Sequence, residues 1–151
     1  MSLHQDIFES KADALVNPVN CVGVMGGGLA KEFRLRYPRM NEAYQEACAR
    51  GEVRVGKMWQ WWQPPIISQG RWIINFPTKD DWREPSKLAY IGNGLRDLTR
   101  VVSDLELKSI AVPALGCGLG GLDWATVAPM IINAVSGLCE LELYPPQKGR
   151  P

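Results

Sequence analysis

A regular alternation of short apolar runs with helix-type patterns constrains the fold of this chain more than any other feature. Strands are predicted over residues 14–19, 58–62, 71–76, 109–115 and 138–143. Helices are predicted over residues 28–37, from Asn41 to a stop at Gly51, over 86–105 and from about residue 123 onward. This order predicts an α/β domain with a mixed, mostly parallel central sheet and helices on both faces.

Proline and polar residues define the predicted ends of the helices. Pro38 is predicted to end the first helix, Asn41 to cap the second and Ser86 to cap the third, and Pro129 is predicted to kink the last. An apolar stripe on the third helix is predicted to face inward: Leu88, Ile91, Leu95, Leu98, Val102 and Leu105. We expect one domain over residues 1–144. The proline-rich residues 145–151 are predicted to begin a linker or tail, as in a fragment of a longer protein.

The supply of histidine and cysteine restricts the chemistry. The chain has a single histidine, His4, which excludes multi-histidine metal sites and leaves a Ser–His or Cys–His pair only if His4 is the base. The four cysteines form no Cys-x-x-Cys motif, so we predict no metal, no cofactor and no disulfide framework. Lysine, carboxylates or bound water remain to carry any reaction.

Charge and hydropathy limit the partners. The net charge is +1, which provides no overall attraction for nucleic acid, although Lys31, Arg34, Arg36 and Arg39 supply a local basic face. No apolar run approaches the roughly 20 residues of a membrane helix, and the N-terminus lacks the pattern of a signal peptide. We therefore expect a cytoplasmic protein with no membrane partner.

Two glycine-rich segments, "NCVGVMGGGLA" and "ALGCGLGGLDW", each follow a predicted strand and open a predicted helix. Glycine permits a positive φ and a close approach of the backbone, and N–H groups at a helix start attract anions. The two loops predict a clamp for a diphosphate. The second also matches the dinucleotide-binding pattern through Gly116, Gly118 and Gly121, with Glu140 or Glu142 as ribose ligand. That fingerprint normally opens its fold, whereas here one strand remains, so the match is interpreted as incidental.

Lys79 follows a predicted strand directly in "INFPTKDDW". In a parallel sheet, ligands bind beyond the carboxyl ends of the strands, so this lysine is predicted to lie at the site.

Asn17, Asn20, both glycine segments and "INFPTK" together resemble the macrodomain family, whose α/β fold binds ADP-ribose. The resemblance extends from Asp6 to about Leu143. "INFPTK" with "ALGCGLGGLDW" is similar to the branch that holds the lysine-dependent terminal ADP-ribose glycohydrolase and the DarG antitoxins, and "KDDW" and "LDW" favour the DarG type. That type implies a hydrolase that removes ADP-ribose from thymidine in single-stranded DNA and so reverses its partner toxin DarT, bound through a C-terminal part absent here.

The resemblance also implies roles for individual residues. Lys79 corresponds to the catalytic lysine, Asp6 and Ile7 to the pair that meets the adenine, and Asn20 to the asparagine beside the distal ribose. The glycine loops are implied to hold the diphosphate and distal ribose through Gly23, Val24, Met25, Gly26, Gly27, Gly28, Leu115, Gly116, Cys117, Gly118, Leu119 and Gly120. Cys21 and Cys117 are interpreted as loop fillers rather than nucleophiles, since no histidine accompanies them.

Two positions depart from the pattern. Gly27 stands where DarG-type sequences often have a lysine, and Gly120 stands where the protein-directed glycohydrolase has an aspartate. Lys79 is therefore left with three possible roles: attack on the anomeric carbon C1″, trapping of the ring-opened aldehyde as a Schiff base, or stabilisation of developing charge.

Trp82 follows the lysine, and we predict that it contacts nucleic acid by stacking on a thymine or flanking base; Trp124 is a weaker candidate. Two other functions stay open on the sequence. One is an ADP-ribose-binding reader that hydrolyses nothing, and the other is an enzyme that removes ADP-ribose from protein carboxylates or small compounds.

Overall fold

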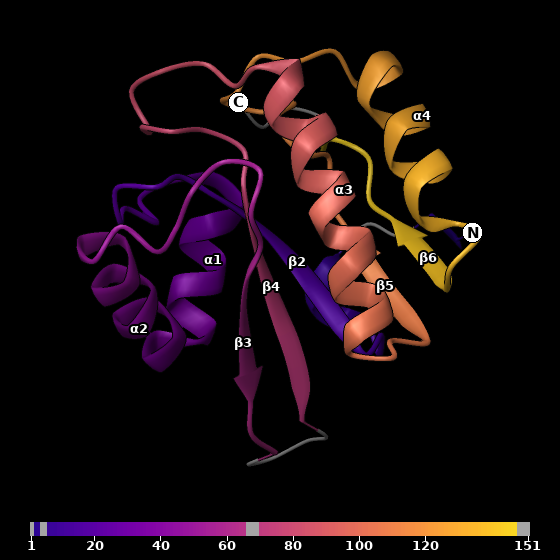
Figure 1. Cartoon of the computed structure of the whole chain (residues 1–151), viewed down its shortest axis with the longest axis horizontal. Coiled ribbons are helices and arrows are strands. Elements are labelled where there is room, and N and C mark those ends of the chain that lie inside the picture. The colour runs from indigo at the N-terminus through magenta and orange to yellow at the C-terminus, as the bar shows by residue number, and fades with distance from the viewer. Residues whose placement is uncertain (1, 4–5, 66–69, 148–151) are drawn as a thin grey trace.

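The computed structural model describes residues 2–3, 6–65 and 70–147, and shows one six-stranded sheet with helices on both faces (Figure 1). The strands lie in the order β1-β6-β5-β2-β4-β3, and every neighbouring pair is parallel except β3 with β4. Their bounds are β1 (Ser2–Leu3), β2 (Ala14–Val19), β3 (Trp59–Gln63), β4 (Arg71–Pro77), β5 (Ser109–Val112) and β6 (Glu140–Leu143). The predicted α/β class and mixed, mostly parallel sheet are confirmed.

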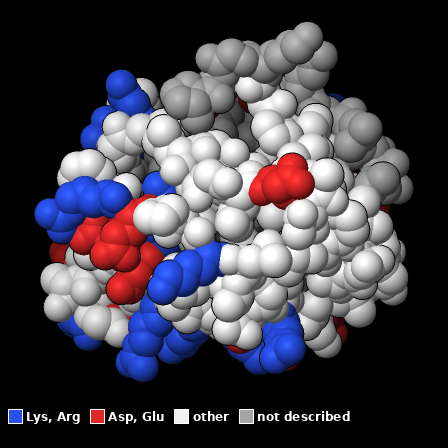
Figure 2. All heavy atoms as spheres, turned by 90° about the horizontal axis from the view of Figure 1, so that it is seen from above, with Lys and Arg blue, Asp and Glu red and all other residues white. Residues whose placement is uncertain are grey.

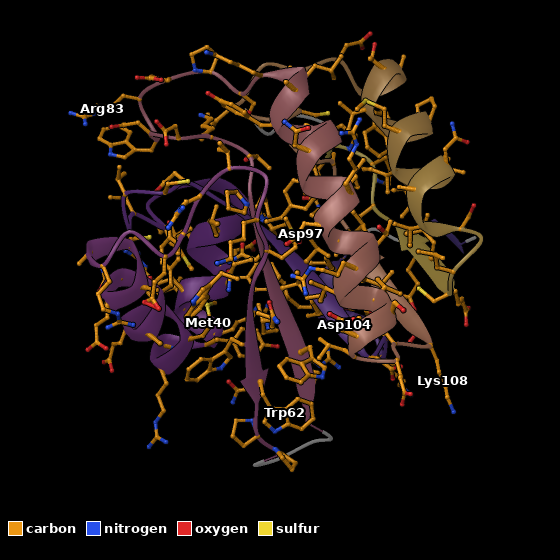
Figure 3. All side chains as sticks on the ribbon, viewed as in Figure 1. Met40, Trp62, Arg83, Asp97, Asp104 and Lys108 are labelled. Carbon is orange, nitrogen blue, oxygen red and sulfur yellow. The ribbon has the colours of Figure 1, made fainter. Side chains whose placement is uncertain are left out.

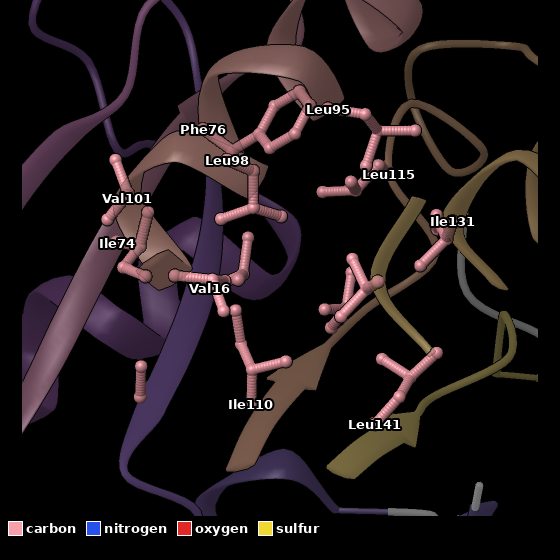
Figure 4. Close-up of a cluster of buried hydrophobic side chains, with 14 of the residues drawn as sticks. Val16, Ile74, Phe76, Leu95, Leu98, Val101, Ile110, Leu115, Ile131 and Leu141 are labelled. Atoms are coloured by element: carbon pink, nitrogen blue, oxygen red, sulfur yellow. The ribbon is translucent and has the colours of Figure 1, made fainter. Parts of the chain in front are cut away.

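Each face of the sheet is covered by a pair of helices. α1 (Gly28–Arg36) and α2 (Pro38–Ala49) lie on one side, and α3 (Leu88–Asp104) and α4 (Trp124–Val135) on the other (Figure 1). Strand residues alternate between the two cores: Leu15, Ile73 and Ala111 pack with α1 and α2, whereas Val16, Ile74 and Ile110 pack with α3 and α4. Figure 4 shows the second cluster between the strands and α3. Because a strand points successive side chains to opposite faces, strands with apolar residues on both faces require this double cover.

A buried polar pair joins the two central strands. Asn17 of β2 stands opposite Asn75 of β4, and the Asn17 Nδ2 donates to Asn75 Oδ1 at 2.9 Å. Both side chains are fully buried. The Asn17 amide also contacts the Met25 sulfur at 3.7 Å, so the sheet is tied here to the first glycine segment.

The predicted start of the second helix was wrong. α2 begins at Pro38, not at Asn41, and Pro38 occupies its first turn, where a missing N–H costs nothing. α1 does end before Pro38, with Tyr37 as the residue shared between the two helices. Proline thus ends one helix and starts the next.

The third helix, in contrast, begins later than predicted. α3 starts at Leu88 with Lys87 at the cap and no side-chain cap hydrogen bond, so Ser86 does not cap it. Leu88 is exposed and Leu105 is half-buried, whereas the other predicted stripe residues are buried. A closely packed contact fixes this helix on the sheet, because a Cβ added at Gly94 would collide with the Phe76 ring. The last helix is continuous from Trp124 to Val135 and includes Pro129 in its interior.

Candidate active site

A cleft of about 910 Å³ opens where the parallel strands β2, β4 and β5 end. Its walls come from the segments that follow these strands, together with a one-turn helix at residues 7–9 and the segment after β6. Figure 2 looks onto this edge of the sheet and shows charged side chains of both signs gathered at the left, with much of the remaining face uncharged. The position is the one at which open α/β sheets bind ligands.

Most of the sequence-predicted residues line this cleft. They are Asp6, Ile7, Asn20, Val24, Gly26, Gly27, Gly28, Lys79, Trp82, Gly116, Gly118, Leu119 and Gly120. Four others do not line it. Gly23 packs on α2, Met25 and Leu115 lie in the core, and Cys117 is half-buried against it. The structure thus brings both glycine segments and the lysine together around one space.

Asn20 organises the first glycine segment through its own side chain. Its Oδ1 accepts from the backbone N–H of Val22 at 3.1 Å and of Val24 at 3.3 Å, and its Nδ2 donates to the Val24 carbonyl at 2.7 Å. The Tyr44 hydroxyl donates to the Asn20 carbonyl at 2.6 Å and lies 3.0 Å from its Oδ1. Asn20 therefore shapes the loop in addition to lining the cleft, with Tyr44 as its buried support.

Lys79 lies between two of the cleft's walls. Its Nζ donates to the carbonyl of Leu119 at 3.3 Å, in the second glycine segment, and to the carbonyl of Trp82 at 3.4 Å. The backbone on either side of Lys79 is fixed to β2 and the turn after it, since Thr78 N–H donates to Val19 O at 2.9 Å and Cys21 N–H to Asp80 O at 3.0 Å. An ammonium has three donors, so one remains for a ligand.

The second glycine segment is tightly folded and leaves no room for a side chain at Gly120. A Cβ there would lie 2.5 Å from the Gly116 carbonyl oxygen and would collide with the Ser86 hydroxyl. Gly116 itself has a φ of +74°, which a residue with a side chain rarely adopts. The aspartate that the protein-directed branch has at this place does not fit the present loop.

The cysteines near the cleft are poor nucleophiles. Burial raises the pKa of the Cys21 thiol to about 12, and the nearby Asp80 carboxylate adds to the effect. Burial also raises the pKa of Cys117 to about 11. Since the thiolate is the reactive form, both thiols are inert near neutral pH.

Several cleft residues were missed from the sequence. Phe8, Thr78, Pro113 and Tyr144 line the cleft, as do residues 145–147, which were predicted to begin a linker. Tyr144 directly follows β6, which is parallel to β5, so the rule that sites lie at carboxyl ends could have identified it. Trp124, the weaker candidate for base stacking, does not line the cleft and packs partly against the core.

Within the described residues no group of three or more histidine, cysteine, aspartate or glutamate side chains is arranged to hold a metal ion. In the same part of the chain, no helix has the length and apolar character needed to cross a bilayer. His4 lies outside the described residues.

The fold and the two glycine segments define an α/β domain with a cleft at the carboxyl edge of its sheet, where such sheets bind ligands. The Macro domain model matches residues 16–131, so the chain belongs to the macrodomain family.

Within the family, the chain is similar to DarG proteins, which confirms the predicted resemblance. It is 49% identical over 151 residues to the DNA ADP-ribosyl glycohydrolase of Mycobacterium tuberculosis, covering 95% of this chain and 41% of that protein. Its structure matches the macrodomain of M. tuberculosis DarG with a TM-score of 0.91, covering 95% of both chains. It also matches Thermosipho africanus DarTG in complex with ADP-ribose, with 34% identity, a TM-score of 0.90, and coverage of 99% of this chain and 43% of that one. The chain spans about two fifths of the length of the curated DNA ADP-ribosyl glycohydrolases that it matches.

Proposed function

We propose that this domain is a DNA ADP-ribosyl glycohydrolase that removes ADP-ribose from thymidine in single-stranded DNA. The observation that carries the proposal is the position of Lys79, whose amine bridges the two walls of the cleft through the Leu119 and Trp82 carbonyls. A pure ADP-ribose reader would need the glycine segments and Asn20 but would have no use for an amine at this place.

The proposed ligand is ADP-ribose along the length of the cleft. Asp6 and Ile7 would meet the adenine, the segments at Gly26–Gly28 and Gly116–Gly120 would hold the diphosphate, and Asn20 would lie beside the distal ribose. Backbone N–H groups in such glycine turns form concave anion sites. Gly23, Met25, Leu115 and Cys117 would contribute only through the shape and backbone of these loops.

The proposed reaction is hydrolysis of the bond between C1″ of the distal ribose and the thymine nitrogen. Water supplies hydroxide to C1″, its proton goes to the base, and the transition state resembles an oxocarbenium ion. Two carbonyl contacts fix the Lys79 amine as a hydrogen-bond donor, which supports stabilisation of charge on the leaving base more directly than nucleophilic attack. The lack of space at Gly120 supports a mechanism without a second-loop carboxylate.

The proposal extends to the biological partner. The similarity to DarG and DarTG proteins supports an antitoxin that acts on the product of a DarT-type ADP-ribosyltransferase, in the cytoplasm. Contact with that toxin would involve a C-terminal part beyond this chain, in keeping with the share of the relatives that the chain spans. Trp82, half-exposed at the cleft, would contact the DNA.

One substrate panel tests the function. The purified domain is incubated with an ADP-ribosylated single-stranded oligonucleotide, with a protein ADP-ribosylated on carboxylates, and with ADP-ribose 1″-phosphate, and free ADP-ribose is measured by chromatography. Release from the oligonucleotide alone supports the proposal. ADP-ribose binding without release from any substrate would establish a reader, and release from the protein alone would establish the protein-directed reaction.

A further inference from the structure

Trp82 is exposed, with 52% of its surface open to solvent. It lines the cleft, and its carbonyl accepts from the Lys79 amine. Two other exposed apolar side chains, Val24 and Leu119, line the same cleft from the two glycine segments. Exposed apolar surface at a cleft marks a place that another molecule covers.

The Trp82 ring is supported by a neighbouring ion pair. The Arg83 guanidinium lies over the indole, with its central carbon 5.5 Å from the ring centroid. Arg83 is itself held by Asp81 in a two-point contact, Nε to Oδ1 at 2.9 Å and Nη2 to Oδ2 at 2.6 Å. The same Oδ1 accepts from the Arg83 backbone N–H at 2.9 Å, so the carboxylate fixes both the turn and the side chain.

The pair remains ionised at physiological pH. Hydrogen bonds from Arg83 lower the pKa of Asp81 to about 2, and the same contact raises the pKa of Arg83. Because the two charges cancel, Arg83 has little net attraction left for a distant phosphate. The arrangement is suited to holding a ring in place, and cation–π contact of this kind favours a fixed indole.

We propose that Asp81 and Arg83 are positioning residues that hold Trp82 as a stacking platform for the unpaired base next to the modified thymidine in single-stranded DNA. The inference rests on the proposed function and deepens it by naming what the protein reads beyond ADP-ribose. Arg83 covers one face of the indole and the neighbouring base stacks on the other. Stacking on an aromatic ring tolerates any base, so this contact selects single-stranded DNA without selecting its sequence.

The alternative role for Arg83 is direct binding of a backbone phosphate. The two roles predict opposite changes in DNA affinity when Asp81 is replaced by asparagine. Asp81→Asn removes the charge that neutralises and orients Arg83. A phosphate-binding Arg83 would then bind DNA more tightly and with a steeper salt dependence. A platform would lose its support and bind DNA more weakly.

The experiment compares two ligands by stopped-flow anisotropy or competition before release occurs: an ADP-ribosylated oligonucleotide and free ADP-ribose. Trp82→Ala is expected to weaken oligonucleotide binding by roughly 5- to 150-fold, the range for loss of one base stack. Arg83→Ala and Asp81→Asn are each expected to weaken it by about 2- to 5-fold, the range for an exposed cation–π contact. Both substitutions should leave the affinity for free ADP-ribose unchanged.

A matched control comes from a second exposed ion pair. Arg100 on α3 contacts Asp97 at 2.8 Å and Asp104 at 2.9 Å, and Figure 3 shows Asp97 and Asp104 along α3, far from Arg83 at the upper left. Arg100→Ala should leave oligonucleotide binding unchanged. Tighter binding by Asp81→Asn, or equal losses for the oligonucleotide and free ADP-ribose, would overturn the platform. If the wild type released no ADP-ribose from DNA, the proposed function would be overturned instead. The comparison of oligonucleotide and ADP-ribose binding would still test the stacking platform.

Discussion

The hydrogen bond from Tyr44 to Asn20 connects the fold to the site, and removing one oxygen atom tests that connection. Tyr44 is fully buried in α2, and its hydroxyl donates to the Asn20 carbonyl at 2.6 Å. Tyr44→Phe keeps the ring and its packing but removes the donor. We expect the variant to fold less stably and to hold the first glycine segment less firmly.

The size of the effect follows from the burial of the contact. A buried acceptor that loses its donor costs about 1–3 kcal/mol of folding free energy. For a domain of this size, each kcal/mol shifts the melting midpoint by about 2–4 °C, so the variant should melt roughly 2–12 °C lower. ADP-ribose affinity should fall several-fold, because part of the binding energy would be used to order the loop.

Urea and thermal unfolding, with and without ADP-ribose, measure both effects. Tyr90→Phe is the control, since Tyr90 is a partly exposed tyrosine on α3, and its loss of stability should stay within about 0.5 kcal/mol. If Tyr44→Phe matched the wild type in midpoint and affinity, Asn20 would not depend on Tyr44 and the account of the loop would be wrong.

Three other positions should respond to substitution in ways that the structure specifies. Gly94→Ala would drive a Cβ into the Phe76 ring and should lower the free energy of unfolding in urea by about 1–3 kcal/mol. Gly92→Ala, whose added Cβ would make only ordinary contacts, should be neutral or should raise this free energy by about 0.5–1 kcal/mol. Equal effects of the two substitutions would contradict the packing described. Gly27→Lys should fold normally, because the φ of Gly27 is −152° and an added Cβ would make only ordinary contacts. Calorimetry should find tighter binding of ADP-ribose by this variant at low salt. Unchanged affinity would mean that this loop does not lie beside the diphosphate. The pKa of Cys21 is raised from 9.0 to about 12, so the thiol contributes stability that is complete below pH 9 and is lost as pH rises from 9 to 12. Cys21→Ala should therefore flatten the decline of the unfolding free energy over this pH range. An unaltered slope would contradict the burial effect.

The sheet could be predicted because its signal is local. The apolar runs at residues 14–19 and 71–76 match β2 and β4 closely, since strands buried on both faces have few polar residues and end at turn residues. The predicted diphosphate clamp located the cleft for the same reason, because the glycine segments and Lys79 each follow such a strand. Neighbouring parallel strands bring these segments to one edge of the sheet.

Features that depend on distant contacts could not be predicted. The engagement of Asn20 by Tyr44 joins residues 24 positions apart, and residues 145–147 reach the cleft only because β6 ends beside it. Pro38 was ambiguous locally, since proline is compatible with the end of one helix and with the first turn of another. The misplaced start of α2 follows from that ambiguity.

The central proposal is that the Lys79 amine stabilises charge on the leaving base while water cleaves the glycosidic bond, and that the amine is not required for binding of ADP-ribose. The most direct test is Lys79→Ala, with ADP-ribose affinity measured by calorimetry and single-turnover release measured from an ADP-ribosylated single-stranded oligonucleotide. Lys87→Ala, an exposed lysine at the start of α3, is the matched control. We predict ADP-ribose affinity within a few-fold of the wild type and release slower by about 100-fold or more, the cost of removing a positioned charge stabiliser. Release by Lys79→Ala at the rate of the Lys87→Ala control would contradict the account.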